Sequence, residues 1–185
     1  MQAFTENIRE IAVSVDDESK VKLSKKVEDS HQMDIKTDML KNAMFHLRSV
    51  DLRHVKIEAT SSVITPNANT ISLRIAAGHL DVHVTEEFSA KMERIIKKKP
   101  PSTTVIQMIF SEFNENEDNI NNSNIFKDLV PRGEQGKVFI GFPTSQTTGC
   151  SLHLAARVIP TVRKMIDALY WLAKLLILIT LSNSN

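Results

Sequence analysis

Apolar and polar residues alternate along five stretches of this chain, and this period of two constrains the fold more than any other feature. Successive side chains of a β-strand point to opposite faces of a sheet, so the alternation is typical of strands with one buried face. The stretches span residues 50–59, 71–76, 80–84, 103–110 and 151–158. In the first, the apolar phase changes between Leu52 and Val55, which predicts a β-bulge. Asn67 to Asn69 predicts a turn, and Gly78 separates the second stretch from the third, which predicts a hairpin.

Residues 137–142 are apolar without alternation, as expected for a strand in the interior of a sheet. Residues 112–124 contain six asparagines and few large apolar residues, which predicts a loop or an exposed insertion.

Two stretches repeat apolar residues with the period of a helix. In the first, Ile35, Met39, Ala43 and Leu47 recur every four residues after Asp34, which is a suitable N-cap. This spacing predicts an amphipathic helix that begins at Asp34.

The second predicted helix follows Thr85 and stops before Pro100 and Pro101. Acidic residues lie at its positive end and three lysines at its negative end, which suits the helix dipole. The apolar residues expected to form its buried stripe are Phe88, Met92, Ile95 and Ile96.

The N-terminal region has a weaker pattern. Ile8, Ile11, Ala12 and Val15 are spaced for one face of a helix or, as the second choice, for a short strand. Residues 22–30 alternate irregularly and are interpreted as a solvated linker.

These elements predict an α+β fold. It would contain a mixed, mainly antiparallel sheet of five or six strands with helices on one face, plus a C-terminal apolar helix. A length of 185 residues fits one ordinary domain with some additional sequence. The predicted division is an N-terminal element and linker at residues 1–33, an α/β domain at residues 34–162 and an atypical apolar helix at residues 163–185.

Charge and cysteine content limit the partners and the compartment. The net charge of +1 gives no overall field that would attract nucleic acid, so no nucleic-acid partner is expected. The basic residues Lys91 and Arg94 and the lysines after them are explained by the helix end. The single cysteine, Cys150, cannot form an internal disulfide, and the first residues lack the pattern of a signal peptide. We therefore expect an intracellular protein, cytoplasmic or nuclear.

Three blocks of sequence resemble one family. Gln135 to Val162, QGKVFIGFPTSQTTGCSLHLAARVIPTV, resembles a block in large fungal sacsin-like proteins that carry an ATPase domain of the histidine-kinase and heat-shock-chaperone type. The stretches RIAAGHLDVHVTEEFSAKMERIIKKKPPSTTVIQMIF and VDLRHVKIEA resemble the same family in the same order. The resemblance implies a transducer-like domain, downstream of the nucleotide pocket, that couples the nucleotide state of a neighbouring ATPase domain to the rest of the protein. ATP and magnesium are implied only for the parent protein.

The chain itself lacks the residues of a nucleotide site. Asn42 echoes the asparagine of such a site, but only Asp38 lies one turn before it, and no aspartate-and-glycine adenine motif follows. The five glycines do not cluster into a phosphate-binding loop. We therefore expect no cofactor, no catalytic residue and no enzyme activity from this chain.

Histidine and cysteine spacing supports the same expectation. The six histidines show no metal-ligand spacing, and we interpret His79 and His83 as polar residues at a sheet edge. Cys150 and His153 would face opposite sides of a strand, so they do not form a nucleophile and base pair.

One polar turn is the candidate site. Gln146, Thr147, Thr148 and Gly149 lie between two apolar strands and could present hydroxyl, amide and backbone N–H groups to a phosphate or to a neighbouring domain, with Lys137 close by. The alternative is a hairpin in which Thr and Gly satisfy turn geometry alone.

An apolar run begins at Met165 and ends at Leu181, close to the minimum length for crossing a bilayer, but it includes Asp167 and Lys174. A buried helix, a membrane anchor and an aberrant end of the coding sequence are the three interpretations. The sequence departs here from the family pattern, so we favour an altered terminus that forms an amphipathic helix. The alternative function is a membrane-tethered protein-interaction domain that uses this run.

Overall fold

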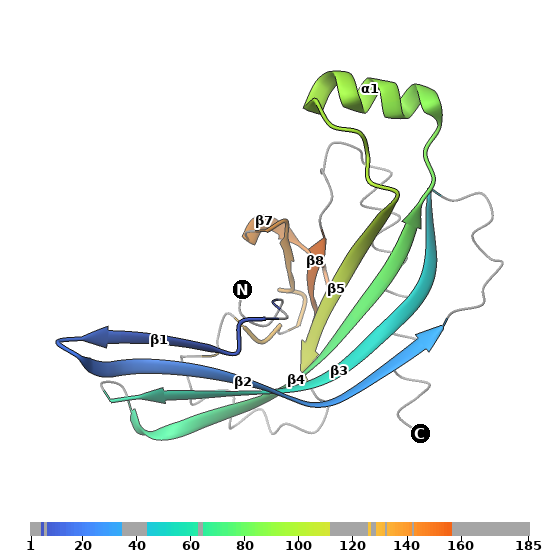
Figure 1. Cartoon of the computed structure of the whole chain (residues 1–185). Coiled ribbons are helices and arrows are strands. Elements are labelled where there is room, and N and C mark those ends of the chain that lie inside the picture. The colour runs from blue at the N-terminus through green and yellow to red at the C-terminus, as the bar shows by residue number, and fades with distance from the viewer. Residues whose placement is uncertain are drawn as a thin grey trace.

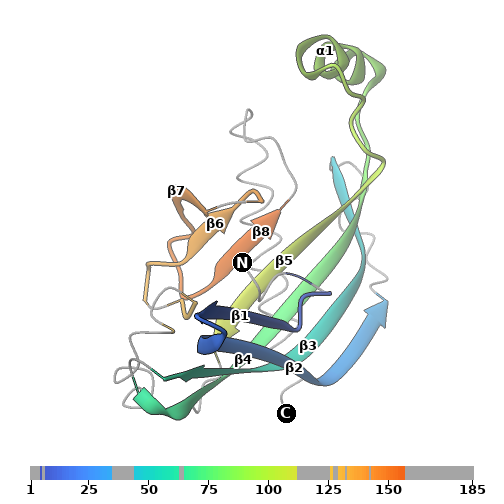
Figure 2. The same ribbon diagram turned by 60° about the vertical axis from the view of Figure 1, so that its left-hand side comes forward.

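A computed structural model describes residues 5, 7–34, 44–62, 65–111, 126, 129–131, 133–141 and 143–156. These residues form one sheet that curls into a half-barrel, with the strand order β1-β2-β3-β4-β5-β8-β6-β7 (Figures 1 and 2). Neighbouring strands are antiparallel except β6 and β8, which are parallel. The elements in chain order are β1 (Glu10–Val15), β2 (Glu18–Asp34), β3 (Phe45–Ser61), β4 (Thr65–Val82), α1 (Glu86–Ile96), β5 (Thr103–Ser111), β6 (Lys137–Phe139), β7 (Pro143–Thr147) and β8 (His153–Ala156).

The predicted α+β fold is wrong, because the described part of the chain is mostly sheet and its one helix covers neither face of it. Helix α1 connects β4 to β5 and projects beyond the ends of those strands (Figures 1 and 2). Its local structure is as predicted: Thr85 is the N-cap, and its hydroxyl accepts the N–H of Phe88 at 3.2 Å. The stripe is not buried as expected, since Ile95 is 61% exposed.

The helix predicted to start at Asp34 is wrong at both ends. Asp34 is the last residue of β2, and Leu47 lies in β3 beside Phe45 and Val50 in one apolar cluster. Residues 35–43 lie outside the described residues. A spacing of four residues satisfies the strand period as well as the helical one, so Ala43 and Leu47 could not distinguish the two.

The linker predicted at residues 22–30 is also wrong, because these residues belong to the 17-residue strand β2. Most of its side chains are exposed, which explains the missing apolar pattern. Backbone pairing holds β2 in place: it runs antiparallel to β3 from Val21 to Asp34. The strand alternative for the N-terminal element is the correct one from Glu10 onward.

Strands β3 and β4 are long and unbroken, so the predicted turn at Asn67 and hairpin at Gly78 do not exist. Gly78 lies within β4, opposite Val50 of β3 and Ile106 of β5. The bulge predicted between Leu52 and Val55 is absent from β3; the extra residue there belongs to β2, between Val27 and Asp29.

The phase changes in the sequence mark a switch of the buried face. In β4, odd-numbered residues from Ile71 to Ile75 pack into one cluster, whereas the even-numbered Ala76 and Leu80 pack into another. Because β4 pairs with β5 without a register shift, odd and even residues point to opposite faces. Each long strand therefore has two halves that bury opposite faces of the sheet. In β4 the half that ends at Ile75 buries one face, and the half that begins at Ala76 buries the opposite face.

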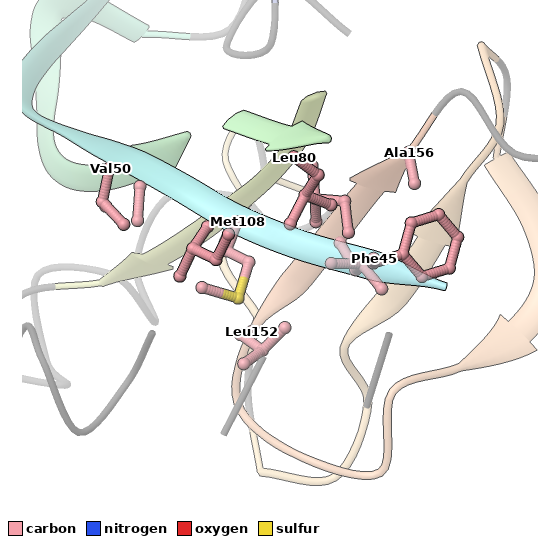
Figure 3. Close-up of a cluster of buried hydrophobic side chains, with 10 residues drawn as sticks. Phe45, Val50, Leu80, Met108, Leu152 and Ala156 are labelled. Carbon is pink, nitrogen blue, oxygen red and sulfur yellow. The ribbon is translucent and has the colours of Figure 1, made fainter. Parts of the chain in front are cut away.

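Two hydrophobic cores result, and we name them by strand position. The upper core, near α1, contains Phe45, Leu47, Val50, Ala76, Leu80, Ile106, Met108, Leu152, Leu154 and Ala156 (Figure 3). The lower core, on the opposite face, contains Val55, Ile57, Ala59, Ile71, Leu73, Ile75, Ile109, Phe126 and Val130. Strands of 17 and 18 residues extend about 55 Å and carry the right-handed twist of all strands, so opposite ends of one strand can present opposite faces to a core.

The loop predicted at residues 112–124 and the predicted C-terminal apolar helix lie outside the described residues. Within the described ranges, no helix combines the length and apolar character that crossing a membrane requires.

Candidate functional site

The five predicted site residues lie together at one border of the sheet, on the β6–β7 hairpin and the loop that leads to β8 (Figures 1 and 2). Lys137 and Thr147 are directly opposite each other in the hairpin, and Gln146 precedes Thr147 on β7. The predicted interior strand at residues 137–142 is shorter than expected. β6 ends at Phe139, and the chain reverses at Gly141, whose φ of 74° suits glycine.

A glycine clamp holds the loop between β7 and β8 against the start of β6. The N–H of Gly136 donates to the carbonyl of Cys150 at 3.1 Å, and the N–H of Thr148 donates to the carbonyl of Gly136 at 2.8 Å. A Cβ atom at position 136 would lie 1.8 Å from the carbonyl oxygen of Leu152 and 2.2 Å from the hydroxyl of Thr148. The close approach therefore requires glycine at position 136.

The hydroxyl of Thr148 is used inside this loop. It lies 3.0 Å from the carbonyl of Cys150 and 2.9 Å from the carbonyl of Leu152, so these two acceptors share its one proton. The loop turns at Gly149, whose φ is 68°. Thr148 and Gly149 thus satisfy turn geometry, which was the alternative interpretation of these two residues.

The imidazole of His153 supports β6. The backbone N–H of Lys137 donates to Nδ1 of His153 at 2.9 Å, so the proton of the neutral ring lies on Nε2. The ring is buried and meets Phe139 edge-on, with centroids 5.6 Å apart. The thiol of Cys150 lies instead 3.5 Å from the Thr148 hydroxyl. Nδ1 of His153 is occupied by a backbone donor, so it does not serve as a base for that thiol in this arrangement.

Gln146 and Thr147 are the predicted residues that point outward. Both side chains are exposed, and both belong to β7, the last strand at this border of the sheet. The outer side of β7 also carries backbone groups that no strand of the described sheet pairs. The arrangement can bind a polar surface or an extended segment of another protein.

A second polar cluster, on β3 and β4, was missed. Nε2 of His79 lies 2.9 Å from Oδ2 of Asp51, and Nη2 of Arg53 lies 3.8 Å from the same oxygen. His79 was interpreted as an edge residue, but β4 is an interior strand and this side chain is half-buried. The three residues lie on the face opposite the upper core. Arg53 and Asp51 are two and four residues from Val55 on β3, and His79 is four residues from Ile75 on β4, so all three share the face of these lower-core residues. In the sequence, these three residues are visible only as polar positions within alternating stretches. Their closeness follows from the register of β3 with β4, which the alternation does not specify.

No group of three or more metal-ligating side chains is close enough to hold a metal ion within the described residues. Asn42 and Asp38, the only echo of a nucleotide site, lie outside them.

A protein-family model matches this chain. The model of a family described as "Protein of unknown function (DUF3684)" matches residues 60–170, which is more than half of the chain and includes the candidate site. No curated protein and no solved structure matches the chain. The chain therefore belongs to the DUF3684 family.

Proposed function

We propose that this chain is a non-catalytic coupling module of a larger, chaperone-type ATPase of the sacsin-like kind. In this proposal the β6–β7 border docks on a neighbouring ATPase domain and responds to its nucleotide state. ATP and magnesium belong to that neighbouring domain. The chain contributes a surface and a stiff sheet.

The observation that carries the proposal is the way the Gly136 clamp presents Gln146 and Thr147. The loop satisfies its own polar groups through Thr148, so its conformation does not depend on a ligand. The exposed amide of Gln146 and hydroxyl of Thr147 are adjacent on β7 and therefore lie on opposite faces of this border, where a partner that pairs with β7 can reach both. A preorganised polar border of this kind lowers the entropy cost of docking.

The sheet offers a route for the coupling. Strand β6 pairs with β8, β8 pairs with β5, and β5 pairs with β4. In this proposal, a displacement of β7 would pass through these backbone hydrogen bonds toward the strands that carry α1 and both cores.

Binding to the nucleotide-binding domain of a sacsin-like ATPase tests the proposal. The chain is immobilised, and its affinity for that domain is measured by biolayer interferometry with ADP and with a non-hydrolysable ATP analogue. We expect the two affinities to differ by about fivefold or more, which is the range of ordinary allosteric coupling. The double variant Gln146→Ala/Thr147→Ala should weaken binding in both states.

The matched control is Gln32→Ala/Thr60→Ala, which removes the same two chemical groups from exposed positions on β2 and β3. Its affinities should equal those of the wild type. Equal affinities in the two nucleotide states, or no binding at all, would contradict the coupling function. Hydrolysis of ATP by the purified chain alone would contradict its non-catalytic character.

A further inference from the structure

Strand β1 forms the other border of the sheet, and its surface is unusually apolar for an exposed strand. It pairs only with β2 in the described sheet, and all six of its residues are exposed. Ile11, Val13 and Val15 are 41%, 55% and 51% exposed. By the alternation of side chains they share one face. Ile11 lies opposite Leu23, which packs against the lower core, so this apolar row continues the face of that core.

The outward backbone groups of β1 can be assigned. The N–H of Lys25 donates to the carbonyl of Arg9 at 2.7 Å, and residues 9 and 25 continue the register in which Glu10 lies opposite Ser24. In an antiparallel pair, every second residue turns both of its backbone groups to the partner. Arg9, Ile11 and Val13 therefore bond to β2. Glu10 and Ala12 direct their N–H and C=O groups away from the sheet.

This border lacks the usual protection against pairing. Natural edge strands are shielded by lysine, by proline, by inward charges or by β-bulges. The β1–β2 register shifts between Val13 and Ser14, but the extra residue belongs to β2, so β1 itself is not bulged. β1 has the sequence EIAVSV, with no lysine, arginine or proline, and its one charge, Glu10, is paired with Lys22 at 3.0 Å.

We infer that β1 pairs in antiparallel orientation with β1 of a second copy of this chain, about a two-fold axis at Val13. In this register Val13 lies opposite its own symmetry mate, and Ile11 of each copy lies opposite Val15 of the other. The N–H and C=O groups of Ala12, which point away from β2, then bond to the partner strand, in agreement with the alternation of inward and outward backbone groups along β1. The two-fold axis makes one surface complementary to itself.

Charge selects a second copy over an unrelated strand. Arg9 precedes β1, and the tight turn after it carries Asp16 and Asp17, with φ values of 52° and 63°. Antiparallel pairing places Arg9 of each copy beside the acidic turn of the other, twice in one interface. Glu10 then lies opposite Asp16, but its charge is already paired with Lys22. Six residues per strand make a small interface, so we expect a weak dimer in reversible equilibrium with monomer.

Sedimentation velocity over a concentration range of about two orders of magnitude tests the inference. We expect the wild-type chain to shift reversibly from monomer to dimer. Val13→Lys should abolish the shift, because it places two ammonium groups opposite each other at the axis. Ala12→Pro should abolish it as well, because it removes an outward N–H that β2 does not use.

Val27→Lys is the matched control. Val27 lies on the same face as Val13 and is 48% exposed, but it belongs to β2, outside the stretch that pairs with β1. This variant should dimerise like the wild type. A wild-type chain that remains monomeric, a Val13→Lys chain that still dimerises, or a Val27→Lys chain that does not would each overturn the inference.

Oxidative cross-linking keeps the test decisive if a lysine variant fails to fold. Val13→Cys should form a disulfide dimer at least about tenfold faster than Val27→Cys, since only position 13 meets its own mate, and the wild type with Cys150 gives the background rate. Equal rates for the two cysteine variants would reject this pairing.

Discussion

Strands β1 and β4 show the same alternation of apolar residues, yet one is exposed and the other is buried. Leu73 of β4 is 0% exposed, whereas Val13 of β1 is 55% exposed. β4 has a neighbouring strand on each side, and its odd and even residues pack into different cores. Within the part of the chain that the structure describes, β1 has one neighbouring strand, and its apolar row is exposed. Packing of other side chains over the face of the strand, and not the alternation itself, decides burial here.

The difference predicts where the stability of the sheet resides. Side chains of β3, β4 and β5 supply most of both cores, whereas β1 and β2 add backbone pairing and two partly buried side chains, Leu23 and Met33. The borders can therefore change sequence at little cost to the fold, and they are the natural place for contacts with partners.

The largest expected effect is at the centre. Leu73→Ala should lower the free energy of unfolding by about 3–4 kcal/mol, because it removes a fully buried side chain and leaves a cavity. Urea denaturation followed by circular dichroism measures it. A loss below about 1 kcal/mol would show that the lower core is not packed as described.

Gly136→Ala should have the next largest effect, with a loss of about 1–3 kcal/mol from overpacking against the loop carbonyls. Gly133→Ala is the control: Gly133 has a φ of 52°, but no atom lies within 4 Å of the added Cβ. A Gly136→Ala variant that keeps the stability of the wild type would contradict the close approach, because position 136 has no left-handed φ that would otherwise require glycine.

Thr85→Ala should cost about 1 kcal/mol, because the Phe88 N–H loses its capping acceptor. Since α1 projects from the sheet, the loss should appear as faster hydrogen exchange within residues 86–96 and leave the strands unaffected. Thr85→Ser retains the hydroxyl and should restore protection. A loss shared equally by the strands would mean that α1 folds as one unit with the sheet.

The smallest effect is expected at the border. Val15→Thr keeps a β-branched side chain at an exposed position and should change the stability of the monomer by less than about 0.5 kcal/mol. Thermal unfolding at low protein concentration measures it. A loss comparable to that of Leu73→Ala would remove the distinction between centre and border.

Local signals predicted the local structure, and long-range pairing determined the rest. Thr85 and the two prolines were sufficient to predict α1. The alternating stretches predicted strands, but the hairpin predicted at Gly78 was wrong, because the phase change reflects a switch of the buried face between Ile75 and Ala76. β2 was missed because a strand that is mostly exposed needs no apolar pattern.

The sequence predicted which five residues lie together in the candidate site, but not the hydrogen bonds that they form. The five residues meet at the β6–β7 border, as their closeness in sequence allowed, but the bonds of Thr148 to two carbonyls depend on the position of Gly136. The Asp51 and His79 pair depends on the register of β3 with β4, which no local pattern specifies.

Hydrogen exchange of the purified chain at low concentration, read by mass spectrometry, tests the contrast between centre and borders most directly. The account predicts that amides in residues 71–80 of β4 exchange only through near-global unfolding, at least about a hundredfold more slowly than those of β1 and β7. Exchange that is equally slow in β1, β7 and β4, or equally fast in all three, would contradict it.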